Sequence, residues 1–224
     1  MGTTFLDSLT LREVTDLRAS GRERRFDAGA AIFHEGDDAG SVIVLLAGRT
    51  KLTVPNTTGR EVIVAVRGPG DLLGELAALV DAPRAATVAT IEPVEALIVS
   101  GSAFASFLER HSRVALVILR LVAERLLYAD LQQAQFATHD VVGRVAHRLV
   151  ELTERFGVDG ESGIVLEVPL SQEELAGWTG ASREAVNKAL QVLRSLHMIE
   201  TGRRRFTVLD VDGLRRLAGL SRPL

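Results

Sequence analysis

The sequence contains no cysteine, few aromatic residues and no long hydrophobic run. The absence of cysteine excludes disulfides, thiolate-bound iron–sulfur clusters and zinc sites with cysteine ligands. Aromatic residues make up only 4% of the chain, so its cores must be built mainly from alanine, leucine, valine and isoleucine. The longest apolar runs, such as VIVLLAG and VALVIL, are far shorter than the roughly 20 residues that a transmembrane helix needs. No membrane partner is therefore expected.

The N-terminal stretch also lacks the basic patch followed by an apolar segment that marks a signal peptide. We therefore expect a cytoplasmic protein. The length of 224 residues predicts one large domain or two modest ones. A composition with 46% hydrophobic and 25% charged residues is typical of an ordinary globular protein.

Charge is distributed unevenly along the chain, although the net charge is only −3. Residues 178–224 carry a net charge of +5, whereas residues 1–177 carry −8. This asymmetry predicts an acidic body with a basic end that binds an anionic partner. Chance fluctuation is the alternative explanation.

Two kinds of periodicity divide the chain. A first helix is predicted after Thr10, which lies at capping-box spacing from Glu13. Residues 26–100 contain short runs rich in valine, isoleucine and leucine, separated by glycines, which predicts an antiparallel β-sandwich or barrel. The periodicity then becomes helical, with a short helix over 102–110 and a longer one over about 113–137.

The longer helix carries a heptad repeat of mostly apolar residues. Their spacing alternates between four and three, which is the signature of a seam that packs against a partner helix. The repeat therefore predicts a homodimer. Packing on the chain's own barrel is the alternative, and both contacts are compatible on different faces. The residues expected to face the barrel are Val117, Leu121, Leu127 and Leu131. The seam consists of Ala115, Leu119, Val122, Leu126, Ala129, Gln133 and Phe136.

Residues 171–196 predict two short helices joined by a glycine turn. Ser171 and Glu174 lie at capping-box spacing at the start of the first helix. Gly180 supplies the turn, and Ser182 starts the second helix. This arrangement is a helix-turn-helix, whose second helix fits the DNA major groove. Its buried face is predicted to be Val186, Leu190, Leu193 and Leu196.

Charged residues lie at the start of this second helix, where base edges are reached. Contacts of Arg183 with guanine and of Glu184 with cytosine are typical of such a position. The GRRRF run predicts a hairpin turn that holds Arg203, Arg204 and Arg205 near the phosphate backbone, as in a winged motif. A solvated charged helix face is the alternative. The other predicted DNA contacts are Ser171, Gln172, Ser182, Asn187 and Lys188.

Four stretches resemble the Crp/Fnr family of bacterial transcription regulators: IFHEGD, PGDLLGEL, HDVVGRVAHRL and LSQEELAGWTGASREAVNKAL. The resemblance covers essentially the whole chain. It implies an α+β fold with a jelly-roll β-barrel of the cyclic-nucleotide-binding type in residues 1–111. A long dimerisation helix in 112–138 and a winged helix-turn-helix domain in 139–224 would follow. The resemblance also implies a homodimer that binds a palindromic operator in double-stranded DNA, with RNA polymerase as a further candidate partner.

The stretch GELAALVDAPRAA matches the phosphate-binding cassette of that family. The resemblance implies that Glu75 accepts a hydrogen bond from the ribose 2′-hydroxyl of a cyclic nucleotide, while Arg84 pairs with the cyclic phosphate. Backbone N–H groups around Gly74 and Leu76 would assist. Arg125 on the long helix would reach towards the cassette glutamate. Cyclic AMP is the leading effector.

At three positions the chain departs from the cyclic-AMP sensors of the family. Ala85 stands where these commonly carry a serine or threonine hydroxyl for the phosphate. Ala129 and Asp130 stand where a threonine or serine and a polar neighbour meet the adenine. Asp130 would accept from an adenine amino group or from the N1–H and N2–H of guanine, so cyclic GMP is the second effector. An edge residue of the coiled coil is the alternative for this aspartate.

The departures keep a different regulator open, one that binds DNA constitutively and has a degenerate barrel pocket. In that case Glu75 and Arg84 would pair with each other. An enzyme using Glu75 as a base is disfavoured, because the sequence shows no metal-ligand spacing, no activated nucleophile and no second carboxylate near the cassette. No metal site is expected. The histidines are too scattered to suggest haem ligation: His34, His111, His139, His147 and His197.

Overall fold

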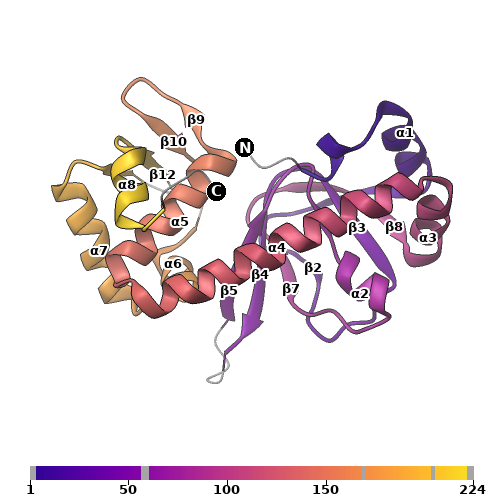
Figure 1. Cartoon of the computed structure of the whole chain (residues 1–224), viewed down its shortest axis with the longest axis horizontal. Helices are drawn as coiled ribbons and strands as arrows, with labels where there is room; N and C mark the ends of the chain where they lie inside the picture. The colour runs from indigo at the N-terminus through magenta and orange to yellow at the C-terminus, as the bar shows by residue number, and fades with distance from the viewer. Residues whose placement is uncertain (1–3, 57–60, 168–169, 203–204, 221–224) are drawn as a thin grey trace. The chain divides into compact units, whose positions relative to one another are not determined.

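The fold is that of a computed structural model, shown in Figure 1. The chain divides into two compact units, Thr3–Leu126 and Leu127–Leu224, and the division falls within the long helix α4 (Ser112–Thr138). Among the described residues, no helix is both long and apolar enough to cross a membrane. The structure describes residues 4–56, 61–167, 170–202 and 205–220, with only the backbone described at 131–138.

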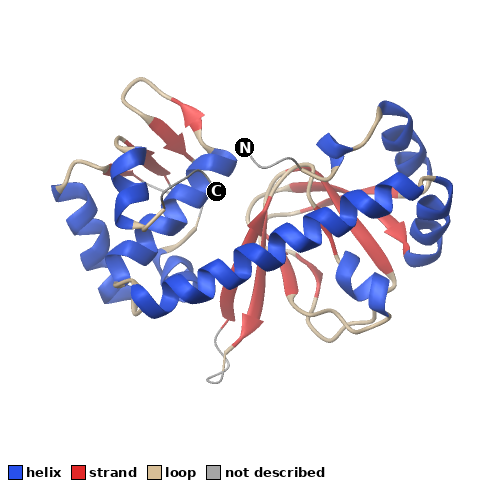
Figure 2. Cartoon of the chain, viewed as in Figure 1, coloured by secondary structure: helices blue, strands red, loops and turns tan. Residues whose placement is uncertain are grey.

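The N-terminal unit consists of two antiparallel four-stranded sheets and the helices that cover one of them (Figure 2). One sheet has the strand order β1-β8-β3-β6, and the other has the order β2-β7-β4-β5. The prediction of a β-rich jelly-roll domain is confirmed, although the two sheets do not close into a continuous barrel. The elements are a 3₁₀ turn (Leu6–Ser8), α1 (Leu11–Ala19), β1 (Arg22–Phe26), β2 (Ala31–Phe33), β3 (Ser41–Ala47), β4 (Thr50–Pro55), β5 (Glu61–Arg67), β6 (Leu72–Leu73), α2 (Glu75–Val80), β7 (Thr87–Thr90), β8 (Val94–Ser100), α3 (Gly101–Arg110) and the first part of α4.

Strand β3 explains how the two layers are held together. Successive side chains of a strand point to opposite faces, so its apolar run SVIVLLA serves two cores at once. Val42 and Val44 belong to the core beneath α1, α3 and α4. Ile43 and Leu45 belong to the core between the two sheets, together with residues such as Val88 of β7. A strand buried on both faces gives a continuous apolar run in place of an alternating one.

The predicted first helix is confirmed as α1, and it is tied to the start of α4. Thr10 and Glu13 form the expected capping box. Glu13 also accepts hydrogen bonds from Arg113, whose guanidinium lowers the pKa of this carboxyl to about 2. The predicted helix over 102–110 is confirmed as α3, one residue longer at its start.

The exposed face of α4 carries part of the predicted heptad seam. Leu119 and Leu126 are 64% and 62% exposed, whereas Val122 is half-buried against the core of the N-terminal unit. The expectation that Leu127 packs on the barrel is wrong, because its side chain is 63% exposed. Val117 does face the core. The side chains of Leu131, Gln133 and Phe136 lie outside the described part of the structure.

The C-terminal unit packs three helices around α5, with a four-stranded antiparallel sheet of order β11-β12-β10-β9. Asp140 caps α5, since its carboxylate accepts from the N–H of Gly143 at 2.9 Å. The terminal helix α8 was not predicted from the sequence. The elements are the end of α4, α5 (Val141–Phe156), β9 (Val158–Asp159), β10 (Ile164–Leu166), α6 (Gln172–Thr179), α7 (Arg183–Ser195), β11 (Ile199–Gly202), β12 (Arg205–Val208) and α8 (Val211–Leu217).

Candidate nucleic-acid interface and effector cassette

Helices α6 and α7 form the predicted helix-turn-helix. Ser171 and Glu174 make the capping box at the start of α6, with each donating to and accepting from the other. Gly180 has φ +59°, a left-handed conformation that a glycine adopts without strain, and it ends α6. Ser182 caps α7 by accepting from the N–H of Ala185 at 3.1 Å. These local interactions fix the start of both helices and the turn between them.

Two buried surfaces hold this motif in place on α5. Arg148 of α5 forms an ion pair with Glu151 at 2.9 Å and lies 4.7 Å above the ring of Trp178 in α6. On α7, Val186 and Leu193 are fully buried, as predicted. The prediction for Leu196 is wrong, because this residue lies beyond the last turn of α7 and is 50% exposed.

The exposed face of α7 carries several of the predicted DNA contacts. The side chains of Arg183, Glu184 and Lys188 are exposed, and Asn187 is half-buried. Glu184 lies in the first turn of the helix. Ser182, directly before the helix, is exposed as well, although its hydroxyl oxygen serves as the cap. The arrangement gives α7 a polar and charged surface on which hydrogen-bond donors and acceptors are free to meet base edges.

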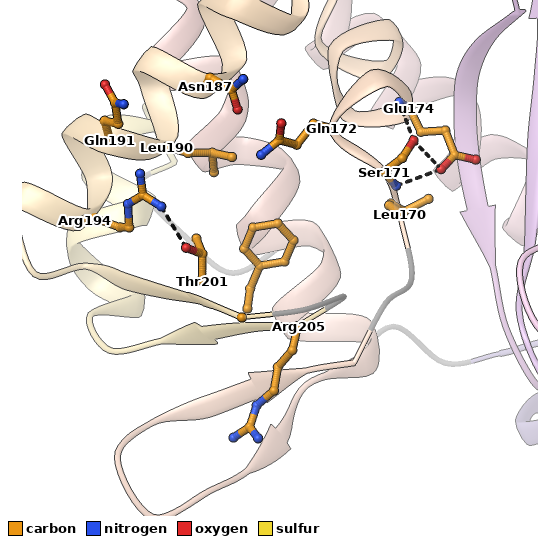
Figure 3. Close-up of a pocket in the computed structure, with 12 residues that line it drawn as sticks. Leu170, Ser171, Gln172, Glu174, Asn187, Leu190, Gln191, Arg194, Thr201 and Arg205 are labelled. Atoms are coloured by element: carbon orange, nitrogen blue, oxygen red, sulfur yellow. Dashed lines mark hydrogen bonds between the residues drawn. The ribbon is translucent and has the colours of Figure 1, made fainter.

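A groove of about 540 Å³ lies between α6, α7 and the hairpin β11–β12 (Figure 3). Three predicted contacts line it, namely Ser171, Gln172 and Asn187, whereas the other predicted residues of α7 do not. The predicted hairpin is confirmed by the antiparallel register of β11 and β12. Arg203 and Arg204 lie outside the described residues. A further predicted residue, Arg205, also lines the groove. The groove residues that were not predicted as contacts include Gln191, Arg194 and Thr201.

The missed groove residues had a signal in the sequence. Asn187, Gln191 and Arg194 are spaced by four and three positions, so they share one face of a helix. Arg194 donates to the hydroxyl of Thr201 in β11 at 2.8 Å. That pairing was not foreseeable, because it depends on the angle at which the hairpin leaves α7.

The second cluster is the predicted cassette, which begins where β6 ends. The stretch opens with the short helix α2, and Gly74 precedes it with φ +75°. A Cβ at Gly74 would lie 2.3 Å from Nη1 of Arg84, so only glycine fits this position. Arg84 is 4% exposed, donates to the carbonyls of Gly74 at 3.0 Å and Ser41 at 2.6 Å, and lies 4.3 Å from the ring centre of Phe33.

Glu75 is buried at the first position of α2 and accepts a hydrogen bond from Arg125 of α4. The alternative that Glu75 and Arg84 pair with each other is therefore not what the structure contains. The charges of Asp37 and Glu75 still act on Arg84 through space. Burial lowers the pKa of the Arg84 guanidinium, and these two carboxylates oppose that effect.

Comparisons with known proteins agree with both clusters. Residues 23–111 match the cyclic nucleotide-binding domain, and residues 143–217 match the Crp-like helix-turn-helix domain. The chain is 34% identical over 165 residues to the CRP-like cAMP-activated global transcriptional regulator of Mycobacterium tuberculosis, with 74% of each chain covered. The chain belongs to the Crp family. It is a transcriptional regulator that joins a cyclic nucleotide-binding domain to a Crp-like helix-turn-helix.

Two further relatives extend the comparison of this Crp-family chain. It is 29% identical over 202 residues to the cyclic AMP receptor protein of Thermus thermophilus, which covers 90% of each chain. The solved structure of FixK2 from Bradyrhizobium japonicum has a TM-score of 0.79 at 22% identity, covering 90% of this chain and 99% of that one. The likeness to FixK2 concerns the fold alone.

The remaining predicted effector residues of this Crp-family regulator are exposed. Leu76 is 48% exposed on α2, and Ala85 is exposed directly after Arg84. Ala129 and Asp130 are exposed on α4, in the part of that helix that belongs to the C-terminal unit. Among the described residues, no three histidine, aspartate or glutamate side chains gather in a way that would hold a metal ion.

One feature of the cassette fits an anionic ligand. The Nε–H of Arg84 is buried and has no hydrogen-bond partner among the described residues. A buried guanidinium with an unused donor is costly unless an acceptor completes it. Phosphate oxygens suit guanidinium donors in charge and in geometry. The cassette residues therefore fit a phosphate group, and the buried carboxylate of Glu75 lies close enough to Arg84 to act on its charge.

Proposed function

We propose that this regulator acts as a homodimer that binds a palindromic operator and that a cyclic nucleotide in the N-terminal cassette sets its affinity for DNA. Cyclic AMP is the first candidate and cyclic GMP the second. The observation that carries the effector part is the buried Arg84, with its unpartnered Nε–H, close to the buried Glu75. The relatives named for cyclic AMP support the same choice.

The DNA contacts follow from the exposed face of α7. Arg183 donates to the two acceptors of a guanine, and Glu184 accepts from a cytosine amino group. Lys188 and Asn187 supply further base or phosphate contacts. Gln172, at the start of α6, and Arg205, on the hairpin, both line the groove and would contact phosphates on either side of it. The helix N-terminus at α6 adds backbone donors for a phosphate.

The homodimer is supported by the apolar residues that α4 leaves exposed. Leu119 and Leu126 lie seven positions apart on the heptad seam, and each exposes more than half of its side chain. Burying such residues against a partner helix is favourable by about 1.5–3 kcal/mol for each side chain. Two-fold symmetry then places the two recognition helices about 34 Å apart, one turn of DNA, which is the spacing of a palindromic operator.

In the cassette, each group has one task. Arg84 and the N–H groups around Gly74 bind the cyclic phosphate, and Glu75 accepts from the ribose 2′-hydroxyl. Arg125 holds the carboxylate of Glu75 in place. Ala85 supplies no hydroxyl, which costs a hydrogen bond of about 1.5–3 kcal/mol to the charged phosphate and predicts weaker binding than a serine would give.

Isothermal titration of the purified chain with cyclic AMP, and then with cyclic GMP, tests the effector. We expect micromolar binding that Arg84→Gln abolishes, while the exposed control Arg12→Gln binds normally. A preference for one base would assign its recognition to Asp130, and Asp130→Asn should remove that preference. Absence of heat with both nucleotides, from a chain that still binds DNA, would contradict the effector part.

The second candidate is constitutive DNA binding with a cassette that has lost its ligand. It is favoured by one observation, since Arg125 already satisfies Glu75 and two backbone carbonyls already satisfy part of Arg84. Selection of binding sites from random duplexes, with and without nucleotide, separates the two candidates. Recovery of the same palindrome at equal affinity in both pools would support constitutive binding.

The proposal also covers the location of the protein, its contact with RNA polymerase and the question of enzymatic activity. A regulator of this kind acts in the bacterial cytoplasm, where DNA is found, and contacts RNA polymerase through its surface when it activates. We also infer that the chain is not an enzyme, because Glu75 is engaged by Arg125 and is not available as a base. Unchanged cyclic nucleotide after long incubation with the protein, measured by chromatography, is the expected result.

A further inference from the structure

One wall of the groove beside the recognition helix is strand β11, and a side-chain hydrogen bond links this strand to the helix. Strand β11 is the edge strand of the C-terminal sheet, so within the described sheet it pairs only with β12. Its other side faces α7. There the guanidinium of Arg194 crosses the groove and donates to Oγ1 of Thr201 at 2.8 Å (Figure 3). This hydrogen bond links the hairpin directly to the recognition helix.

The turn between α7 and β11 fixes only the base of the hairpin. His197 has φ +54°, its N–H donates to the carbonyl of Arg194, and the N–H of Met198 donates to that of Leu193. These two bonds form a Schellman motif, which sets the direction in which the chain leaves the helix. Thr201 lies three residues further on, about 10 Å along an extended strand. The hydrogen bond from Arg194 to Thr201 therefore holds the strand about 10 Å from the turn. At that distance, a small change in the angle between strand and helix displaces the hairpin more than it does next to the turn.

The part of the hairpin beyond Thr201 carries a positive charge. In the register of the two strands Thr201 pairs with Phe206, and Gly202 pairs with Arg205. Arg205 is among the residues that line the groove, and Figure 3 shows its side chain extending away from α7. The position of this cation relative to α7 therefore depends on how far the hairpin stands from the helix. The distance between Arg205 and α7 matters because both must contact the same DNA duplex.

We infer that Arg194 is a positioning residue for DNA binding, which acts through Thr201 to hold the hairpin at the separation from α7 that lets both contact one duplex. The inference rests on the proposed binding of DNA by α7 and the hairpin. Arg194 and Thr201 are both exposed, so their hydrogen bond adds little to the stability of the fold. Its effect lies in the geometry of the interface.

Direct contact of Arg194 with a phosphate is the competing role, and the two roles respond differently to substitution. Thr201→Val removes the acceptor but keeps the shape of Thr201 and the charge of Arg194. Arg194→Ala removes both the link and the charge. Thr201→Ser restores the hydroxyl and serves as the conservative rescue. Ser195→Ala is the matched control, because its hydroxyl donates only within α7, to the carbonyl of Val192.

The experiment measures binding by fluorescence anisotropy over a range of salt concentrations, with a duplex of about 30 base pairs recovered by selection. For Thr201→Val we expect a dissociation constant about 3- to 10-fold higher. We also expect the slope of the logarithm of affinity against the logarithm of salt concentration to decrease by the equivalent of about one phosphate contact, because Arg205 no longer reaches its phosphate. Arg194→Ala and the double variant should show the same loss as Thr201→Val. Thr201→Ser and Ser195→Ala should match the wild type.

Two results would overturn the inference while leaving the proposed function intact. One is a Thr201→Val protein with wild-type affinity and salt dependence. The other is a double variant whose loss equals the combined losses of the single variants, since Arg194 would then act on DNA directly. If the wild type itself binds no duplex, the proposed function fails instead. Melting temperatures equal to that of the wild type confirm that the variants are folded.

Discussion

The guanidinium of Arg125 lies against the carboxylate of Glu75 and also donates to the carbonyl of Leu72 at 3.0 Å. The side chain of Glu75 is 4% exposed, whereas that of Arg125 is 27% exposed. The carboxylate is thus a buried charge whose main compensation comes from one arginine. Loss of that arginine leaves the buried charge without its hydrogen-bonded partner.

Arg125→Leu should therefore lower the free energy of unfolding by about 3 kcal/mol, the lower end of the range for breaking a buried pair, because Arg125 itself remains partly in water. Urea titration followed by circular dichroism measures this difference. The double variant Arg125→Leu/Glu75→Gln should recover most of it, since the buried charge is then absent. A single variant as stable as the wild type would contradict the role given to this pair.

His147 predicts a pH dependence of stability. Burial, together with the positive charge of Arg148, lowers the pKa of His147 to about 4, and its Nε2 lies 3.1 Å from the hydroxyl of Tyr128. The folded chain therefore binds fewer protons at this site than the unfolded chain between about pH 6.5 and pH 4. Its contribution to stability is complete above that window and is lost as the pH falls through it.

His147→Gln should weaken this dependence, because glutamine has no proton to gain. Melting temperatures of the two proteins, recorded from neutral pH down to about pH 4, provide the measurement. We expect the wild type to lose stability faster than the variant across the window. Parallel curves for the two proteins would show that His147 does not titrate as described.

The seam on α4 gives a prediction about assembly. Leu126→Lys places a charge on the face that would meet the partner helix, and burying an unpaired charge is strongly unfavourable. Sedimentation should show a dimer for the wild type and a monomer for this variant. Glu124→Lys, at an exposed position on the side of α4 away from Leu119 and Leu126, is the control and should remain dimeric. Dimers in both variants would place the interface elsewhere.

Arg183 tests the assignment of α7 as the recognition helix. Arg183→Ala should weaken operator binding by about 1–3 kcal/mol and relax the sequence preference at a single base pair in each half-site. Sites selected by the variant from random duplexes reveal such a change directly. An unchanged preference would mean that Arg183 contacts the backbone or no DNA at all.

Local signals in the sequence were sufficient for most of the fold. Capping boxes at Thr10 and Ser171 and the turn at Gly180 involve residues within a few positions of each other, so composition and spacing reveal them. The alternation of side chains in β3 could not be seen, because both of its faces are buried. The short helix α2 was missed for a related reason, since six mostly small apolar residues show no helical period.

The sites were predicted in part. Glu75 and Arg84 were identified through a family resemblance, but their partners depend on tertiary packing. Arg84 bonds to Ser41, which is 43 positions away, and Glu75 bonds to Arg125 at a separation of 50. No pattern of nearby residues predicts such pairs. The hydrogen bond from Arg194 to Thr201 was not predicted for the same reason, although both residues lie close to the predicted motif.

In the proposed function, a nucleotide in the cassette controls the binding of DNA at α7. The most direct test of this control is the affinity of the full chain for its selected operator, measured with and without saturating cyclic AMP. We expect at least about 5-fold tighter binding with the nucleotide, the lower end of a typical coupling between sites, and no difference for Arg84→Gln. Equal affinity of the wild type in both conditions would contradict it.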